Sequence, residues 1–145
     1  MNRPRGFTLV EVLLSVAIIS VLAGMSLPVY QSFNNRNELD ITTQSLANAL
    51  RRAQLYSRGS QNDSTWGVEI QSGAITLFKG SVFASRDTAY DEATIVPANV
   101  AISGDGEVLF AKLSGAPDAT GSITLTSINN DIRTVTINAK GMVTY

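Results

Sequence analysis

The sequence predicts an α+β protein in which one long N-terminal helix, with a transmembrane first half, packs against an antiparallel β-sheet. An uncharged apolar run extends from Val12 to Val29, and a segment with helical spacing of apolar residues follows it. After Gly59 the chain is rich in Ser, Thr, Val and Ile, with Gly, Asn and Asp between short runs. We expect a short basic segment at 1–6, a transmembrane helix at 7–30, an amphipathic helix at 31–58 and an antiparallel β head at 59–145. Residues 31–145 should form one globular domain.

The segment from Phe7 to Tyr30 has the length of a membrane span. At helical rise it covers about 36 Å, compared with about 30 Å for the hydrocarbon core of a bilayer. Glu11 is the one charged residue in this segment. A carboxylate at that depth costs a few kcal/mol and by default indicates a functional site with a partner.

Basic residues precede this segment, whereas charges of mixed sign follow it. Arg3 and Arg5 lie before the segment, and Arg36 is accompanied by Glu38 and Asp40 after it. The positive-inside rule therefore predicts a single membrane pass, with a cytoplasmic N-terminus and an exported head. A cleaved secretory signal peptide ending at Ala23 is the alternative, but an acid at the start of its apolar region would be unusual.

The run Gly6-Phe7-Thr8-Leu9-Val10-Glu11 before an apolar span resembles the N-terminus of type IV pilins and type II secretion pseudopilins. The resemblance implies that a prepilin peptidase cuts between Gly6 and Phe7 and that the new amine of Phe7 is N-methylated. It also implies that Glu11 is the carboxylate needed for assembly with other pilins or pseudopilins into a periplasmic or extracellular filament. Residues 66–80, 121–125 and 135–141 are similar to the GspH/FimT minor pseudopilins.

Simple electrostatics favours the same role for Glu11. The amine freed at Phe7 would be a cation among apolar side chains, about one helical turn from the carboxylate. A pair between these groups, in one subunit or between neighbours, would neutralise both charges. The alternative is an acid that lies among lipid headgroups.

The segment 31–58 is predicted to be an amphipathic helix that packs on the chain's own sheet. Its apolar face is marked by residues at helical spacing, and we expect it to end near Arg58 and Gly59. The residues of this face are Leu39, Thr43, Leu46, Leu50 and Ala53.

Beyond Gly59 the spacing predicts three hairpins and a short last strand. We expect irregular loops at 86–92 and 111–121. The predicted strand pairs are 66–71 with 74–79, 99–103 with 107–111 around the turn Gly104-Asp105-Gly106, and 123–126 with 135–138, followed by 142–145.

The composition argues against an enzyme. The chain has no Cys and no His, which excludes thiol nucleophiles, His-based acid/base catalysis and the usual zinc ligands. Asp87, Asp91 and Glu92 lack the spacing of a calcium loop and are predicted to form a solvated face. We predict no catalytic residue, no metal site and no cofactor, and a minor pilin or pseudopilin that serves as a structural filament subunit.

Three arginines near the predicted helix end raise an alternative function. Some proteins of the resembled superfamily bind DNA during uptake, and Arg51, Arg52 and Arg58 could contact phosphates. We favour a role for these residues in compensating the helix dipole. The net charge is −1, and near the C-terminus this chain has Lys140 where DNA-binding relatives carry Arg. Nucleic acid is therefore not the expected partner.

Overall fold

The structure is a computed structural model that describes residues 6–104 and 106–145, without the side chains of residues 25–29. Residues 1–5 of the predicted leader 1–6, the predicted turn residue Asp105 and the side chains at the end of the predicted membrane span thus lie outside the described part. In this described part, one long helix is followed by eight strands and two short 3-10 helices. These are α1 (Leu9–Arg58), η1 (Gln61–Asp63), β1 (Trp66–Gln71), β2 (Ala74–Lys79), η2 (Phe83–Ser85), β3 (Asp87–Ile95), β4 (Val100–Ser103), β5 (Glu107–Phe110), β6 (Gly121–Ser127), β7 (Ile132–Ile137) and β8 (Val143–Thr144).

Internal contacts divide the chain into two units, one that ends at Asn34 and one from Asn35 to Tyr145. In the first unit the described apolar side chains of α1 lie exposed, and Phe7 is 83% and Leu9 78% exposed. Among the residues that the structure describes, no helix combines the length and hydropathy required to cross a bilayer. The membrane span at 7–30 stays a prediction.

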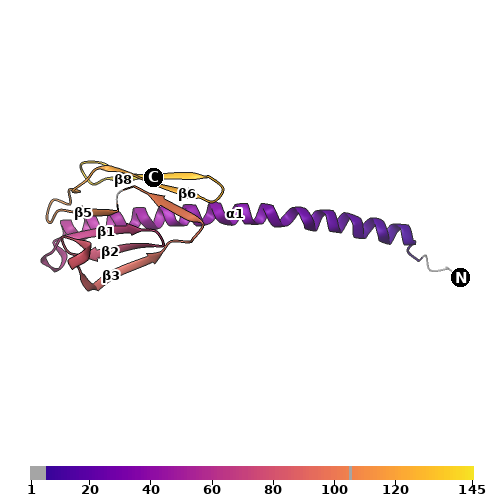
Figure 1. The fold of residues 1–145 in the computed structure, drawn as a ribbon, viewed down its shortest axis with the longest axis horizontal. Coiled ribbons are helices and arrows are strands. Elements are labelled where there is room, and N and C mark those ends of the chain that lie inside the picture. Colours follow the sequence, from indigo (N-terminus) through magenta and orange to yellow (C-terminus); the bar gives the residue numbers. More distant parts are fainter. Residues whose placement is uncertain (1–5, 105) are drawn as a thin grey trace. The chain divides into compact units, whose positions relative to one another are not determined.

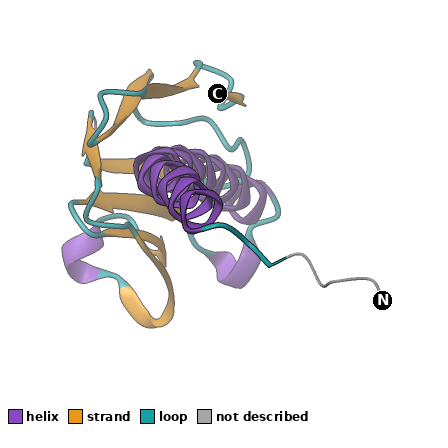
Figure 2. Cartoon of the chain, turned by 90° about the vertical axis from the view of Figure 1, so that its right-hand side faces the viewer, coloured by secondary structure: helices purple, strands orange, loops and turns teal. Residues whose placement is uncertain are grey.

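The second unit contains two four-stranded antiparallel sheets, with the orders β3-β2-β1-β5 and β4-β6-β7-β8. Figure 1 shows β1, β2 and β3 side by side in the first sheet, and Figure 2 shows strands around one side of the helical part of this unit. Both sheets contribute to one apolar core, with Val68 from β1 and Leu125 from β6 fully buried in it. The predicted helix packed on antiparallel strands is confirmed, with two sheets in place of one.

The apolar face predicted for the segment 31–58 is the face of α1 that packs in this core. Leu39, Leu46, Leu50 and Ala53 are fully buried, and Thr43 is 2% exposed. Burial of each such leucine contributes about 1.5–3 kcal/mol. The helix ends at Arg58, where the Gly59 N–H donates to the Leu55 carbonyl at 2.9 Å.

Two of the three predicted hairpins are confirmed. β1 and β2 pair in register around Ser72 and Gly73. β6 and β7 pair around the turn at 128–131, where Asn130 adopts a positive φ of 63°. In β6 the alternation of apolar and polar residues matches burial on one face, whereas β2 is buried on both faces from Ile75 to Phe78.

The predicted hairpin around Gly104 and Gly106 is wrong, although both of its strands exist. β4 pairs with β6, and β5 pairs with β1, so the segment between them crosses from one sheet to the other. As a strand of the first sheet, β5 places Val108 opposite Val68 and Phe110 opposite Trp66. All four of these side chains are buried. Burial of these large side chains at the centre of the core overrides the pairing of neighbouring strands.

The loop predicted at 86–92 is also wrong, because most of it belongs to β3. This strand pairs with β2 at the edge of the first sheet, and its register shifts between Leu77 and Lys79. Most β3 side chains are exposed, so no apolar alternation marks the strand in the sequence. Charged side chains on an edge strand also hinder edge-to-edge aggregation.

We predict that Leu46→Asp unfolds a chain that begins at Gln31, because an unpaired carboxylate would replace a fully buried side chain. The expected loss in the free energy of unfolding is more than about 3 kcal/mol. The measurement is thermal unfolding followed by circular dichroism. Ile41→Asp is the matched control, since Ile41 lies 61% exposed on the same helix. Equal melting temperatures for the two variants would contradict the packing.

Candidate functional site

The N-terminal motif lies at the start of α1. Gly6 and Phe7 are exposed ahead of the helix, and Thr8 occupies the N-cap position. The Glu11 N–H donates to Thr8 Oγ1 at 3.3 Å, and the Val12 N–H donates to the Thr8 carbonyl at 3.2 Å. Thr8 and Glu11 thus have the spacing of a capping box, and a carboxylate in the first turn complements the helix dipole. Glu11 therefore has a local role in starting the helix.

The carboxylate of Glu11 remains available for a second role. Its side chain is exposed, and within the described residues it forms no salt bridge. Gly6, Phe7 and Glu11 come together here because they are close in sequence.

The three arginines at the other end of α1 do not form one cluster. Arg52 donates to Glu92 Oε1 at 2.6 Å and to the Tyr56 hydroxyl at 2.8 Å, and these partners raise its pKa further above the usual range. Arg51 donates to the Val143 carbonyl at 3.0 Å, and Arg58 Nε donates to the Ser114 carbonyl at 3.1 Å. Because residues seven apart share a helical face, Arg51 and Arg58 lie together and Arg52 lies beside β3.

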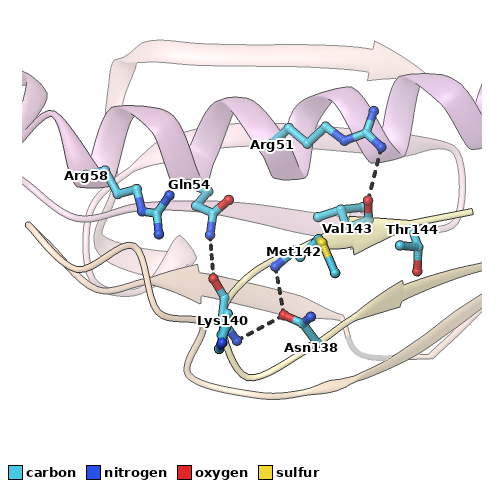
Figure 3. A pocket seen from close by; sticks show the side chains of 8 residues that line it. All are labelled: Arg51, Gln54, Arg58, Asn138, Lys140, Met142, Val143 and Thr144. Atoms are coloured by element: carbon cyan, nitrogen blue, oxygen red, sulfur yellow. Dashed lines mark hydrogen bonds between the residues drawn. The ribbon is translucent and has the colours of Figure 1, made fainter.

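Arg51 and Arg58 line a groove of about 550 Å³, which we call the basic groove. Figure 3 shows that α1 supplies one wall and that the segment leading into β8 supplies the other. Lys140 adds a third cation, a residue that the predicted arginine cluster did not include. The complete lining is Arg51, Gln54, Arg58, Asn138, Lys140, Met142, Val143 and Thr144.

Gln54 links the two walls of the basic groove. Its Nε2 donates to the Lys140 carbonyl at 2.9 Å and to the Gly115 carbonyl at 3.0 Å. Asn138 Oδ1 accepts from the backbone N–H groups of Lys140 at 3.0 Å and Met142 at 2.9 Å, which fixes the turn before β8 (Figure 3). Lys140 is therefore held on an ordered turn.

Two glycines permit this close approach of the loops to α1. Gly141 has φ 76°, and a Cβ there would lie 2.1 Å from Gln54 Nε2. Gly115 has φ 63°, and a Cβ there would lie 2.4 Å from Arg58 Cγ. A side chain at either position would add backbone strain to a steric clash.

The acidic residues considered as a metal site are engaged in ion pairs. Asp87 pairs with Lys79 at 3.5 Å, and Asp91 pairs with Arg86 at 2.8 Å. Within the described residues, no group of three or more His, Cys, Asp or Glu side chains is placed to hold a metal. A further pair, between Lys112 and Asp63, lowers the pKa of Asp63 through the hydrogen bond from the ammonium group.

A family model described as the prokaryotic N-terminal methylation motif matches residues 1–27. The chain therefore resembles type IV pilins in this N-terminal motif, and its second unit has a helix packed on antiparallel sheets.

Two fimbrial proteins and one type IV pilin are similar to this chain. The chain is 28% identical to a fimbrial protein of Moraxella nonliquefaciens over 99 residues, which are 68% of this chain and 58% of that protein. It is 42% identical over 38 residues to fimbrial protein Q of Moraxella bovis, covering 26% of this chain and 24% of that protein, and it matches the type IV major alpha-pilin of Moraxella bovis equally well. The chain thus spans less than two thirds of these relatives. No solved structure matches the chain significantly.

We predict that Gln54→Ala destabilises the protein by about 1–3 kcal/mol, because two backbone carbonyls lose their donor. Chemical denaturation followed by circular dichroism measures this loss. Gln44→Ala removes an exposed glutamine from the same helix and should change stability by less than about 0.5 kcal/mol. A similar small effect for Gln54→Ala would show that the bridge adds nothing to stability.

Proposed function

We propose that this chain is a minor pilin or minor pseudopilin, a structural subunit of a type IV pilus or type II secretion filament. A prepilin peptidase would cut it between Gly6 and Phe7, and the amine of Phe7 would be methylated. The subunit would wait in the inner membrane, with its N-terminus in the cytoplasm and its head exported, and then enter the filament through α1. The names of the relatives support a filament role.

The observation that carries this proposal is the exposed apolar surface of α1 in the first unit. Leu13, Leu14, Ile18, Ile19 and Leu22 are each more than half exposed, and Glu11 is the one charged residue from Phe7 to Tyr30. Burial of each such side chain is worth about 1.5–3 kcal/mol. Lipid before assembly and neighbouring helices afterwards are the surroundings that would supply this burial.

In this proposal the carboxylate of Glu11 forms an ion pair with the amine of Phe7. Cleavage leaves a cation four residues from a carboxylate, and each charge is costly among apolar groups without the other. Pairing between neighbouring subunits would favour the assembled state over isolated subunits. The role is structural, so it requires no enzyme chemistry and no cofactor.

DNA uptake is the weaker candidate. Arg52 is engaged by Glu92, so the three arginines do not present one phosphate-binding surface. From Gln31 onward the chain has nine Lys and Arg against eleven Asp and Glu, which does not attract a polyanion at long range.

Processing tests the first step. After expression with a prepilin peptidase, intact-mass analysis should show a chain that begins at Phe7 and carries one added methyl group. A chain that keeps Met1, or one that begins at Gly24 after signal-peptide cleavage, would contradict the proposal.

Glu11→Gln should leave cleavage and membrane insertion intact but reduce incorporation into sheared filaments at least about tenfold, because the carboxylate partner of the amine is lost. Quantitative immunoblotting of cell and filament fractions measures this effect.

Thr8→Ala is the matched control, because it removes the N-cap oxygen and keeps the Glu11 charge. Its incorporation should stay close to that of the parent chain. An equal defect in both variants would assign the effect to the helix start, and normal incorporation of Glu11→Gln would refute the pairing.

A further inference from the structure

We propose that the basic groove binds an acidic peptide segment of another filament subunit through Arg51, Arg58 and Lys140. This inference rests on the proposed function, since the filament supplies the neighbouring subunit. The ligand chemistry is a short stretch of chain with carboxylates next to an apolar residue.

The distribution of ion pairs singles out this groove. From Asn35 onward, six of the nine basic side chains pair with a described carboxylate. The three that pair with no described carboxylate are Arg51, Arg58 and Lys140, and all three line the basic groove. None of its eight lining residues is acidic. Three basic side chains without a described ion-pair partner therefore line the same groove.

The two guanidinium groups, and the backbone that carries Lys140, are held in place before any ligand binds. Arg51 and Arg58 each give one N–H to a backbone carbonyl, which orients the guanidinium and leaves donors for a carboxylate. Lys140 lies on the turn that Gln54 and Asn138 fix. Such order lowers the conformational entropy lost on binding.

The shape and lining of the groove favour a peptide over a polymer of phosphates. Its volume of about 550 Å³ is that of a site for a few side chains. Met142 is 59% exposed at the groove and offers apolar contact beside the cations. Tyr145 is the neighbouring aromatic side chain, and the Arg51 guanidinium lies over one face of its ring, 5.2 Å from the centroid.

The test is calorimetric titration of the unassembled full chain in non-ionic detergent at low ionic strength. The probe is the capped peptide Gly-Asp-Glu-Leu-Gly, and its uncharged counterpart is Gly-Asn-Gln-Leu-Gly. The acidic peptide should bind at least about tenfold more tightly than the counterpart. Arg58→Gln and Lys140→Gln should each weaken binding about tenfold.

Arg52→Gln is the matched control. It removes the same charge from the same protein, but from the pair with Glu92 on the other side of α1. Its dissociation constant should stay within about twofold of the parent value. If Arg52→Gln weakened peptide binding as much as Arg58→Gln, the effect would depend on net charge alone. That result would contradict binding in the basic groove.

Three other results would also overturn the proposal: no binding at about 1 mM acidic peptide, equal binding of both peptides, or tighter binding of duplex DNA or phosphatidylglycerol vesicles. Because the titration uses unassembled chain, failure of filament assembly would leave its result unaffected. The two proposals can therefore fail separately.

Discussion

Burial of one face of α1 between two sheets is the constraint on which the second unit depends. Leu39, Leu46 and Leu50 lie at zero exposure in a core to which both sheets contribute. Because a helix is rigid, this face also sets the direction of every other side chain on it. Arg51 and Arg58 therefore point toward the turn before β8, whereas Arg52 points toward β3. The basic groove is a geometric consequence of the core.

Polar contacts hold the second sheet along the same helix. Arg36 pairs with Asp131 at 3.2 Å and Arg133 with Asp40 at 2.8 Å near one end, while Gln54 bridges to the turn before β8 near the other. Exposed ion pairs of this kind are each worth less than about 1 kcal/mol. Their main effect is to orient the β6–β7 hairpin, and burial of Leu125 and Val135 supplies the stability.

The N-terminal motif does not depend on tertiary packing, because its residues are neighbours in sequence at the start of α1. Thr8 caps the helix, and Glu11 lies one turn further on. In the proposed function, the carboxylate that complements the helix start would also meet an amine in the assembled filament. The described apolar side chains around it lie exposed.

The sequence by itself determined the features that depend on neighbours along the chain: the N-terminal motif, the buried stripe of α1, its end at Arg58, and the β1–β2 and β6–β7 hairpins. Each has a periodicity or a turn residue that local physics requires. Only the tertiary structure decided that β5 joins β1, that exposed β3 is a strand, and that Lys140 joins Arg51 and Arg58. These features depend on which segments, far apart in the sequence, bury the most apolar area when they pack together. The spacing and composition of one segment do not reveal which distant segment it will pack against.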